Sequence, residues 1–396
     1  MDFPLKAYRK RWRIRRNEKR LRQELDRYES AFKARDLTIP NAADIRKIMK
    51  DRFPHLRAKP KGELSLIAVY HHYNWEDHSL KPALEEFGQV RHYDWFARFN
   101  HERRDWRRSV KREMNRDLLT RIGGWIEEER PDVLFTYLSG ELIDPETAQG
   151  LRAFGIPMIH FSLNDKENFV GKIRGGLAFG SRDICRAFDL AWTSTADALR
   201  KYCVEGVVPL YLPEGANPEI HRPSTIDKTI AVSFVGQCYG NRPAIIRRLG
   251  EAGIPVEAFG YGWPNGALST EEMVRLYSQS RINLGFGGVA GYDATYCLKG
   301  RDFEIPMSGG LYLTEYHPEL ETVYDLGREI VTYRGFDDLA AKIRHLLDHP
   351  DEAEAIRQAG LQRARREHTW EMRFAKVFTL MNLLDDQSRR SDERDG

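Results

Sequence analysis

From Leu64 onward, short apolar runs alternate with segments whose apolar residues recur at helical spacing. Runs of four to eight apolar residues predict buried strands of a parallel sheet, and the segments between them predict the helices that cover it. In the first half, the predicted strands are residues 65–70, 89–93, 133–137, 158–162, 190–193 and 208–211, and the predicted helices are 79–87, 107–129, 144–154 and 196–202. This order predicts an α/β fold with a doubly wound sheet, which binds ligands at the carboxyl edge of its strands.

The alternation stops at residues 212–223, which are rich in proline, glycine and asparagine, and then starts again. In the second half, the predicted strands are residues 230–235, 256–259, 282–286, 311–313 and 329–333, and the predicted helices are 242–252, 270–278, 337–347 and 351–367. A final helix is expected at 371–384, and the polar tail 385–396 is expected to be disordered. The chain is long enough for two domains, which we place at residues 63–222 and 223–370.

The chain before residue 63 has a different pattern. Residues 1–35 hold thirteen Lys or Arg and five Asp or Glu, with apolar residues such as Trp12 and Leu21 at helical spacing. This pattern predicts a basic amphipathic helix within an extension, 1–62, whose linker carries one short helix. Such a helix can lie on anionic lipid, pair with a second copy or dock on the main body. No nucleic-acid-binding module follows it, so we expect no nucleic-acid partner.

Composition narrows the class of protein. The 62 Lys and Arg nearly balance the 59 Asp and Glu, so the whole molecule is not a polyanion binder. The four cysteines are far apart and form no CxxC pair, which indicates reduced structural thiols and argues against a zinc site. No apolar stretch approaches the ~20 residues of a spanning helix, and the basic N-terminus lacks the apolar core of a signal peptide. We therefore expect a cytoplasmic protein, peripheral at the inner face of the membrane if its basic helix binds lipid.

Two glycine turns follow strands of the second half. Strand 230–235 runs into Gly236, Gln237 and a short loop, and then into a helix headed by Arg242. Backbone N–H groups at such a turn attract an anion, and Arg242 would add a full charge for phosphate oxygens. The loop matches neither the P-loop nor the GxGxxG pattern. A second turn, 285–291, contains Gly288 and overlaps the end of strand 282–286.

The segment 298–315, LKGRDFEIPMSGGLYLTE, combines cations, acids and a glycine pair. A helix that begins near Arg301 would place Arg301 and Glu304 one turn apart, and Gly309 and Gly310 would end it before a buried strand. Together, this helix and the two glycine turns would offer amides and guanidinium groups to a diphosphate. The helix would also offer a carboxylate that accepts hydrogen bonds from ribose hydroxyls. A solvated helix face with an Arg–Glu pair is the plainer interpretation.

Polar residues also follow strands of the first half. His71 and His72 follow the first predicted strand, Glu141 lies after the third and Asp165 after the fourth. The carboxyl ends of parallel strands carry ligand contacts, although each of these residue types also serves as a helix cap or loop hydrogen bonder. His160 lies inside strand 158–162, where a core histidine bonded to backbone is the plainer interpretation.

The run from residue 299 to 374 contains FEIPMSGGLYLTE, ELETVYDLGREIVTY, LLDHPDEAEAIRQAG and EHTWEMRF. It resembles the carboxyl-terminal domain of GT-B glycosyltransferases, specifically the CgeB-like (spore-maturation type) group related to glycogen-synthase-like retaining enzymes. GANPEIHRP resembles their interdomain segment, and weaker similarity covers residues 63–211. The resemblance implies two Rossmann-like domains facing each other across a cleft, with the final helix crossing back onto the first domain. It also implies a nucleotide-sugar donor on the second domain, an acceptor on the first, and neither a metal nor another cofactor.

Two positions match motifs of this family. Glu304, with Gly309 five positions later, matches Glu-Ala-x-x-x-Gly, in which the glutamate holds the donor ribose. Arg242 stands where the family has a lysine that neutralises the diphosphate. Two other positions depart from the pattern, because Gln237 replaces an arginine and Tyr296 replaces the first glutamate of Glu-x7-Glu.

The departures leave a cation and an acid to be supplied from elsewhere. Lys299 or Arg301 is the candidate cation, and Asp293 or Asp302 the candidate acid.

The resemblance implies a metal-independent glycosyltransferase that moves a sugar from a nucleoside diphosphate sugar to a hydroxyl of a glycan, a lipid-linked saccharide or a protein. The departing diphosphate would be stabilised by the cations and loop amides. If the configuration inverts, Asp165 or Glu141 is the candidate base and His160 could touch the donor sugar. The alternatives are a nucleotide-sugar or glycan-binding protein without catalysis, and a scaffold that assembles at a membrane through the basic helix.

Overall fold

The computed structural model describes residues 3–71, 74–289, 292 and 295–385. The chain divides into two compact units, one built from Glu214–Met372 and the other from Gln23–Pro213 together with the chain after Met372. We call them the C-terminal unit and the N-terminal unit. The chain up to Arg22 groups with the C-terminal unit.

The N-terminal unit is built on a parallel sheet with strand order β2-β1-β3-β4-β7-β8. The strands are β1 (Leu64–Val69), β2 (Gly88–Tyr93), β3 (Val133–Thr136), β4 (Met158–Ser162), β7 (Leu190–Thr193) and β8 (Val208–Tyr211). All six were predicted to within one residue, because the strands of a fully covered parallel sheet are apolar on both faces. The helices are α2 (Ala42–Arg52), α3 (Asn74–Glu85), α4 (Lys111–Glu128), α5 (Pro145–Arg152), α6 (Asp165–Asn168) and α7 (Ala198–Val204).

Four local features of this unit differ from the prediction. Helix α3 begins five residues earlier and ends two residues earlier than the helix expected at 79–87. The helix expected at 107–129 begins as a π-helical turn, Trp106–Val110, before α4. The short helix α6 and the hairpin of β5 (Ile173–Arg174) and β6 (Leu177–Ala178) were not predicted. Both lie in a stretch without a long apolar run, and the hairpin turns at Gly175 and Gly176, which have positive φ.

The C-terminal unit carries a second parallel sheet, with strand order β10-β9-β11-β12-β13. Its strands are β9 (Ile230–Val235), β10 (Glu257–Phe259), β11 (Ser280–Leu284), β12 (Tyr312–Glu315) and β13 (Val331–Tyr333). Its helices are α8 (Arg242–Glu251), α9 (Thr270–Gln279), α10 (Gly300–Met307), α11 (Gly335–Asp348) and α12 (Pro350–Glu367). Strand β11 begins two residues earlier than predicted because the polar Ser280 is buried, donating to the Ser233 hydroxyl at 2.7 Å.

The division between the units falls after Pro213, earlier than the predicted boundary at residue 222. Residues after Pro213 belong to the C-terminal unit because Ala216 pairs with Thr369 in a parallel bridge. The Ala216 amide donates to the His368 carbonyl at 2.9 Å, and the Trp370 amide donates to the Ala216 carbonyl at 3.1 Å. The amino-acid composition of residues 212–223 gives no indication of this backbone pairing.

The N-terminal helix α1 (Phe3–Ala34) docks through its second half. Glu24 and Lys201 form a buried ion pair at 2.8 Å, and the Tyr28 hydroxyl donates to Glu205 at 2.7 Å. Breaking a buried pair leaves an uncompensated charge, so this contact fixes the helix firmly. Docking, one of three predicted roles, is therefore observed for this half, whereas lipid binding and self-association stay predictions. Among the described helices, none combines the length and apolarity that a membrane crossing requires.

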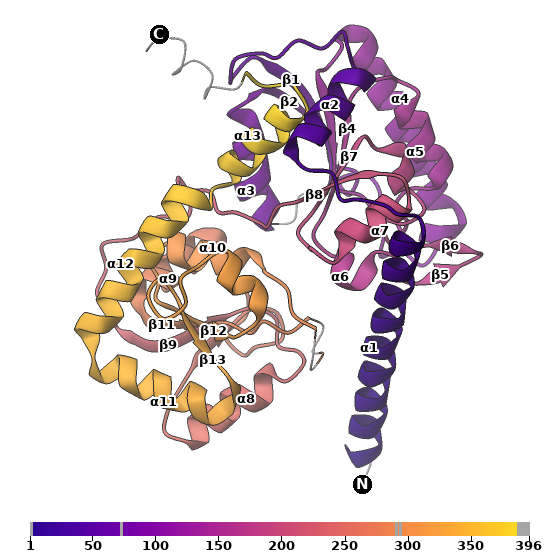
Figure 1. The fold of residues 1–396 in the computed structure, drawn as a ribbon. Coiled ribbons are helices and arrows are strands. Elements are labelled where there is room, and N and C mark those ends of the chain that lie inside the picture. Colours follow the sequence, from indigo (N-terminus) through magenta and orange to yellow (C-terminus); the bar gives the residue numbers. More distant parts are fainter. Residues whose placement is uncertain (1–2, 72–73, 290–291, 293–294, 386–396) are drawn as a thin grey trace. The chain divides into compact units, whose positions relative to one another are not determined.

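The final helix α13 (Trp370–Leu380) continues into the N-terminal unit, where Figure 1 shows it (yellow) beside the sheet. The Phe374 ring packs 5.4 Å from Phe135 and 5.3 Å from Trp192. The helix ends four residues before the predicted end because Asn382 has a φ of 58°. Leu384 then pairs with Lys59 in a parallel bridge.

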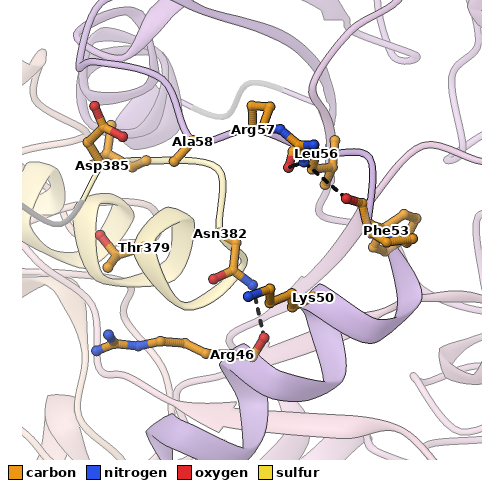
Figure 2. Close-up of a pocket in the computed structure, with 11 residues that line it drawn as sticks. Arg46, Lys50, Phe53, Leu56, Arg57, Ala58, Thr379, Asn382 and Asp385 are labelled. Carbon is orange, nitrogen blue, oxygen red and sulfur yellow. Dashed lines mark hydrogen bonds between the residues drawn. The ribbon is translucent and has the colours of Figure 1, made fainter.

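A cavity of about 480 Å³ lies between α2 and the end of α13 (Figure 2). Its lining includes Arg46, Lys50 and Asn382. Lys59 follows Ala58, a lining residue, in the chain. The Lys59 ammonium group pairs at 2.8 Å with Asp132, which directly precedes β3. The cavity therefore lies toward the amino ends of the strands, away from the carboxyl edge that binds ligands in such sheets.

Replacing Asn382 with alanine should lower the free energy of unfolding by about 2 kcal/mol. The Asn382 amide donates to the Arg46 carbonyl at 2.9 Å (Figure 2), and alanine would lose this bond while keeping a strained positive φ. Glycine relieves the strain, so Asn382→Gly should cost about half as much. Urea unfolding of both variants measures the difference, and equal costs would show that the backbone conformation contributes nothing.

Candidate functional site

The loop after β9 holds the Arg242 guanidinium beneath a glycine turn. Gly236 has a φ of 155°, and its carbonyl accepts from the Trp263 indole at 2.8 Å. Arg242, the first residue of α8, donates through Nη1 to the Gln237 carbonyl at 3.1 Å and lies 4.2 Å from the centroid of the Tyr239 ring. The Gln237 residue itself is exposed. The structure thus places Arg242 against the turn, and its predicted role in binding phosphate stays a prediction.

Arg301 brings a second guanidinium to the same turn. A Cβ added at Gly236 would lie 2.8 Å from Arg301 Nη2, so this guanidinium group lies directly against the turn. Both guanidinium groups, of Arg242 and Arg301, lie 5.5 Å from the centroid of Phe234, near the carboxyl end of β9. Burial and the nearby Arg301 charge lower the pKa of Arg242 to about 10, which leaves it protonated at neutral pH.

Arg301 Nη1 is buried with no hydrogen-bond partner among the described residues. The surrounding tyrosines, Tyr312 and Tyr277, and the charges of Asp302 and Glu304 nevertheless outweigh burial and raise the pKa of Arg301. Two buried positive charges that repel each other are costly, and a bound anion would relieve that cost. The arrangement is therefore suited to hold a group with at least two negative charges.

Lys299 does not offer its charge in the same way. Its Nζ donates at 2.9 Å to each of three consecutive carbonyls, those of residues 286, 287 and 288. An ammonium group has three donors, so this set occupies all of them. Burial lowers the pKa of Lys299 to about 8. Its position fits a role in fastening the second glycine turn rather than the predicted role of binding phosphate directly.

Glu315, the last residue of β12, was missed by sequence reasoning. Its carboxylate accepts hydrogen bonds from the Gly287 and Gly288 amides, while burial raises its pKa. The Gly287 and Gly288 amides are thus occupied within the protein, as is the Gly236 amide of the first turn, which donates to the Phe259 carbonyl at 2.9 Å, so none of these three amides is offered to a ligand. Gly288 also pairs with Tyr296, whose ring stacks on His317. The position of Glu315 at a strand's carboxyl end was the signal that could have found it.

Of the two candidate acids, Asp302 and Asp293, the structure describes only Asp302. Asp302 accepts from the Tyr312 hydroxyl and, at 2.7 Å, from the Lys299 amide. These bonds cap α10 and use both carboxylate oxygens, so the geometry does not fit a reacting acid. Asp293 lies outside the described residues.

Helix α10 places Glu304 as predicted, one turn after Arg301. The helix ends with the Gly310 amide bonded to the Ile305 carbonyl and the Gly309 amide bonded to the Pro306 carbonyl. Gly309 has a φ of 69°, which completes a Schellman motif. Glu304 Oε1 lies 3.9 Å from His221 Nε2. Within the described part of the chain, no group of three or more His, Cys, Asp or Glu could hold a metal ion.

Of the three predicted catalytic residues of the N-terminal unit, two are buried and one is exposed. Asp165 is fully buried, and its carboxylate accepts from the hydroxyls of Ser162, Ser181 and Tyr202 at 2.8–2.9 Å. An acceptor hydroxyl cannot reach a group enclosed in this way, so the geometry does not fit a general base. Glu141 is exposed and lies 3.4 Å from Arg107.

His160 is also fully buried, in the middle of β4. Its ring packs 5.0 Å from Phe188, and neither ring nitrogen has a hydrogen-bond partner among the described residues. Burial lowers its pKa to about 4, so the ring is neutral. Contact with a sugar is not possible from this position, and the predicted backbone bond is absent as well.

His71 has the geometry that the other candidates lack. It follows β1 at the carboxyl edge, and its Nδ1 lies 3.0 Å from Oδ1 of Asp94, which follows the neighbouring strand β2. Asp94 Oδ1 lies where it can accept from an Nδ1–H group, and in that tautomer Nε2 carries no proton. The Phe96 ring packs 4.3 Å from the imidazole, and 14% of the side chain is exposed. His72, its predicted neighbour, lies outside the described residues.

Comparison with solved structures identifies the fold. Similar structures include sucrose-phosphate synthase from Thermosynechococcus elongatus, with 12% identity, a TM-score of 0.58 and coverage of 80% of this chain and 98% of that one. A glycosyltransferase from Rickettsia africae ESF-5 has 10% identity, a TM-score of 0.54 and coverage of 81% and 98%. HepE from Anabaena, in complex with UDP and glucose, has 8% identity, a TM-score of 0.53 and coverage of 80% and 100%. The fold of this chain is that of GT-B glycosyltransferases, with two Rossmann-like units.

The family comparison is more specific and covers the candidate site. Residues 242–379 match the family described as "Glycosyl transferase-like", a match that begins at Arg242 and includes Arg301 and Glu304. This part of the chain is therefore a glycosyl transferase-like domain. No curated protein sequence matches the chain. The narrower resemblance to the CgeB-like group stays a prediction.

Proposed function

We propose that this protein is a glycosyltransferase that takes a sugar from a nucleoside diphosphate sugar and transfers it to an acceptor hydroxyl. The observation that carries the proposal is the pair of buried guanidinium groups, Arg242 and Arg301, beside the Gly236 turn. A diphosphate would bring two negative charges to these two guanidinium groups. The donor base is proposed to be uracil, because the structurally similar HepE is in complex with UDP.

Each residue of the site has a distinct role in this proposal. Arg242 and Arg301 bind the diphosphate and stabilise the charge that it gathers as the glycosidic bond breaks. Glu304 accepts hydrogen bonds from the ribose hydroxyls. Lys299 and Glu315 hold the second glycine turn in shape from its carbonyl and amide sides. Guanidinium groups supply the electrostatic stabilisation in this scheme, so no metal ion is required.

His71 replaces Asp165 as the proposed base. In an inverting transfer, His71 Nε2 removes the proton of the acceptor hydroxyl while Asp94 holds the ring and stabilises the imidazolium that forms. The His–Asp pair lies at the carboxyl edge of the sheet, at a residue accessible enough to meet an acceptor.

Donor hydrolysis tests the proposal without knowledge of the acceptor. Incubation with UDP-glucose, UDP-galactose and UDP-N-acetylglucosamine should release UDP slowly from at least one of them, and Glu304→Gln should abolish the release. A second candidate, nucleotide-sugar binding without transfer, is favoured by Tyr296 in place of an acid. Stabilisation by UDP in a thermal-shift assay, with no release from any donor and no transfer to any acceptor tried, would support that candidate instead.

A further inference from the structure

The first part of α1 carries the excess positive charge of this protein. Residues 1–22 hold ten Lys or Arg and two Asp or Glu, whereas residues 23–396 hold 52 Lys or Arg and 57 Asp or Glu. Trp12 lies in this part with 57% of the residue exposed, although tryptophan is on average a highly buried residue. The proposed glycosyl transfer uses neither this charge nor this tryptophan.

Two apolar stripes run along the single helix α1 (Figure 1), and they lie on opposite faces. One stripe, which contains Leu21 and Tyr28, is covered. Leu21 is 8% exposed, and the Tyr28 ring packs 5.4 Å from Phe169. Trp12 precedes Leu21 by nine residues, about two and a half turns of a helix, so the two side chains project in opposite directions. The contacts of the covered stripe therefore leave Trp12 exposed.

Trp12 belongs to the other stripe. Leu5 and Tyr8 stand seven and four positions before Trp12, the spacing that places residues on one face of a helix. Past Trp12 the same face continues with Arg16 and Lys19, which are exposed. We call these five positions the Trp12 face. The face thus begins with apolar residues and continues with cations.

An anionic membrane surface fits the Trp12 face. The Arg16 guanidinium lies 5.4 Å from the centroid of the Trp12 ring, so a cation and an aromatic ring are presented together. Tryptophan is enriched at the boundary between lipid headgroups and acyl chains, and Lys and Arg are attracted to anionic headgroups. Basic amphipathic helices of this kind lie in the plane of a membrane surface.

A second copy of the helix fits the Trp12 face less well. Two helices that pair along their length require an apolar seam whose positions are three and four residues apart. Leu5, Tyr8 and Trp12 begin such a seam, but it continues into Arg15 and Lys19. Two parallel copies would therefore place like charges against each other, whereas anionic lipid neutralises them.

We propose that the Trp12 face of α1 docks this protein on a membrane surface that contains anionic lipid. The buried pair of Glu24 and Lys201 fixes the rotation of α1, so the Trp12 face stays turned away from the covered stripe. The helix can thus dock on protein with one face and on lipid with the other. The proposal does not depend on the proposed function, because a transferase and a binding protein would dock in the same way.

Co-sedimentation of the full chain with vesicles tests the proposal. Vesicles that contain phosphatidylserine should retain the protein, vesicles of phosphatidylcholine alone should not, and added salt should release it. Arg16→Gln combined with Lys19→Gln should lower the partition coefficient by roughly 30-fold, because each cation near such a surface contributes about 1 kcal/mol. Arg247→Gln combined with Arg328→Gln removes the same net charge from exposed residues elsewhere and should behave like the wild type.

Trp12→Ala tests the apolar contribution without changing a charge. Retention by phosphatidylserine vesicles should fall by roughly tenfold, because a large apolar side chain no longer leaves water. Ile173→Ala is the matched control, since Ile173 is also 57% exposed but lies on β5, and its retention should equal that of the wild type. Without vesicles, UDP release by Trp12→Ala should be unchanged, because Trp12 has no role in the donor site.

Three results would overturn the proposal and leave the proposed function standing. The first is the absence of retention by phosphatidylserine vesicles, or retention that neither Trp12→Ala nor the double substitution lowers. The second is a shift of a single-stranded RNA oligonucleotide by protein that the vesicles do not retain, which would assign the Trp12 face to nucleic acid. The third is a dimer that Trp12→Ala dissociates, again without retention by vesicles, which would assign the face to a second copy.

Discussion

Replacing Arg242 with methionine is expected to weaken UDP binding by roughly 30-fold to several thousand-fold, the equivalent of about 2–5 kcal/mol. Methionine keeps much of the apolar stem that packs on Phe234 and Tyr239, while it removes the buried charge. A diphosphate would then face Arg301 alone. Titration calorimetry with UDP and with uridine separates a lost phosphate contact from a general disturbance of the site. Uridine lacks the phosphates, so it should bind the wild type and Arg242→Met with similar affinity.

Arg247→Met is the matched control for this experiment. Arg247 lies on the same helix, but it is exposed and pairs only loosely with Glu251 at 3.8 Å. The control makes the same change in net charge, so any loss that it shows reports long-range attraction rather than contact. Equal losses for the two variants would show that Arg242 does not touch the phosphates.

Replacing His71 with asparagine should lower turnover by roughly 10²- to 10⁴-fold, the usual contribution of a general base. The affinity for UDP should be unchanged, because the diphosphate and ribose contacts are all assigned to the C-terminal unit. Asp94→Asn should lower turnover less, since it leaves the base in place and disturbs its tautomer and orientation. Initial rates with the donor and acceptor found by screening measure the turnover of each variant.

His55→Asn serves as the control for a lost imidazole, because His55 is exposed and follows α2. Its turnover should match that of the wild type. Full activity of His71→Asn would remove His71 from the reaction and favour a retaining transfer, which needs no base from the protein. A loss of UDP binding by His71→Asn would mean that the substitution disturbs more than the base.

The strands were predictable because burial on both faces of a parallel sheet requires continuous apolar runs, and Met158–Ser162 and Ile230–Val235 were located to the residue. The end of α10 was predictable for a related reason, since Gly309 and Gly310 allow a backbone turn that other residues resist. Arg242 and Arg301 could be nominated because their charge follows directly from the sequence.

What the sequence could not provide was the partner of each charge. Lys299 and Arg301 look equivalent in the sequence, yet one is bound by three carbonyls and the other lies against Gly236. Asp165 follows a strand just as His71 does, but three hydroxyl groups enclose it. His71 and Asp94 meet only because β1 and β2 are neighbours in the sheet, a pairing fixed by tertiary structure.

The most direct test of the central claim is a crystal structure of the protein grown with UDP. The account predicts diphosphate oxygens within hydrogen-bond distance of the Arg242 and Arg301 guanidinium groups, with the ribose hydroxyls against Glu304. UDP bound elsewhere, for example in the cavity beside Arg46, with no density next to Arg242, would contradict it.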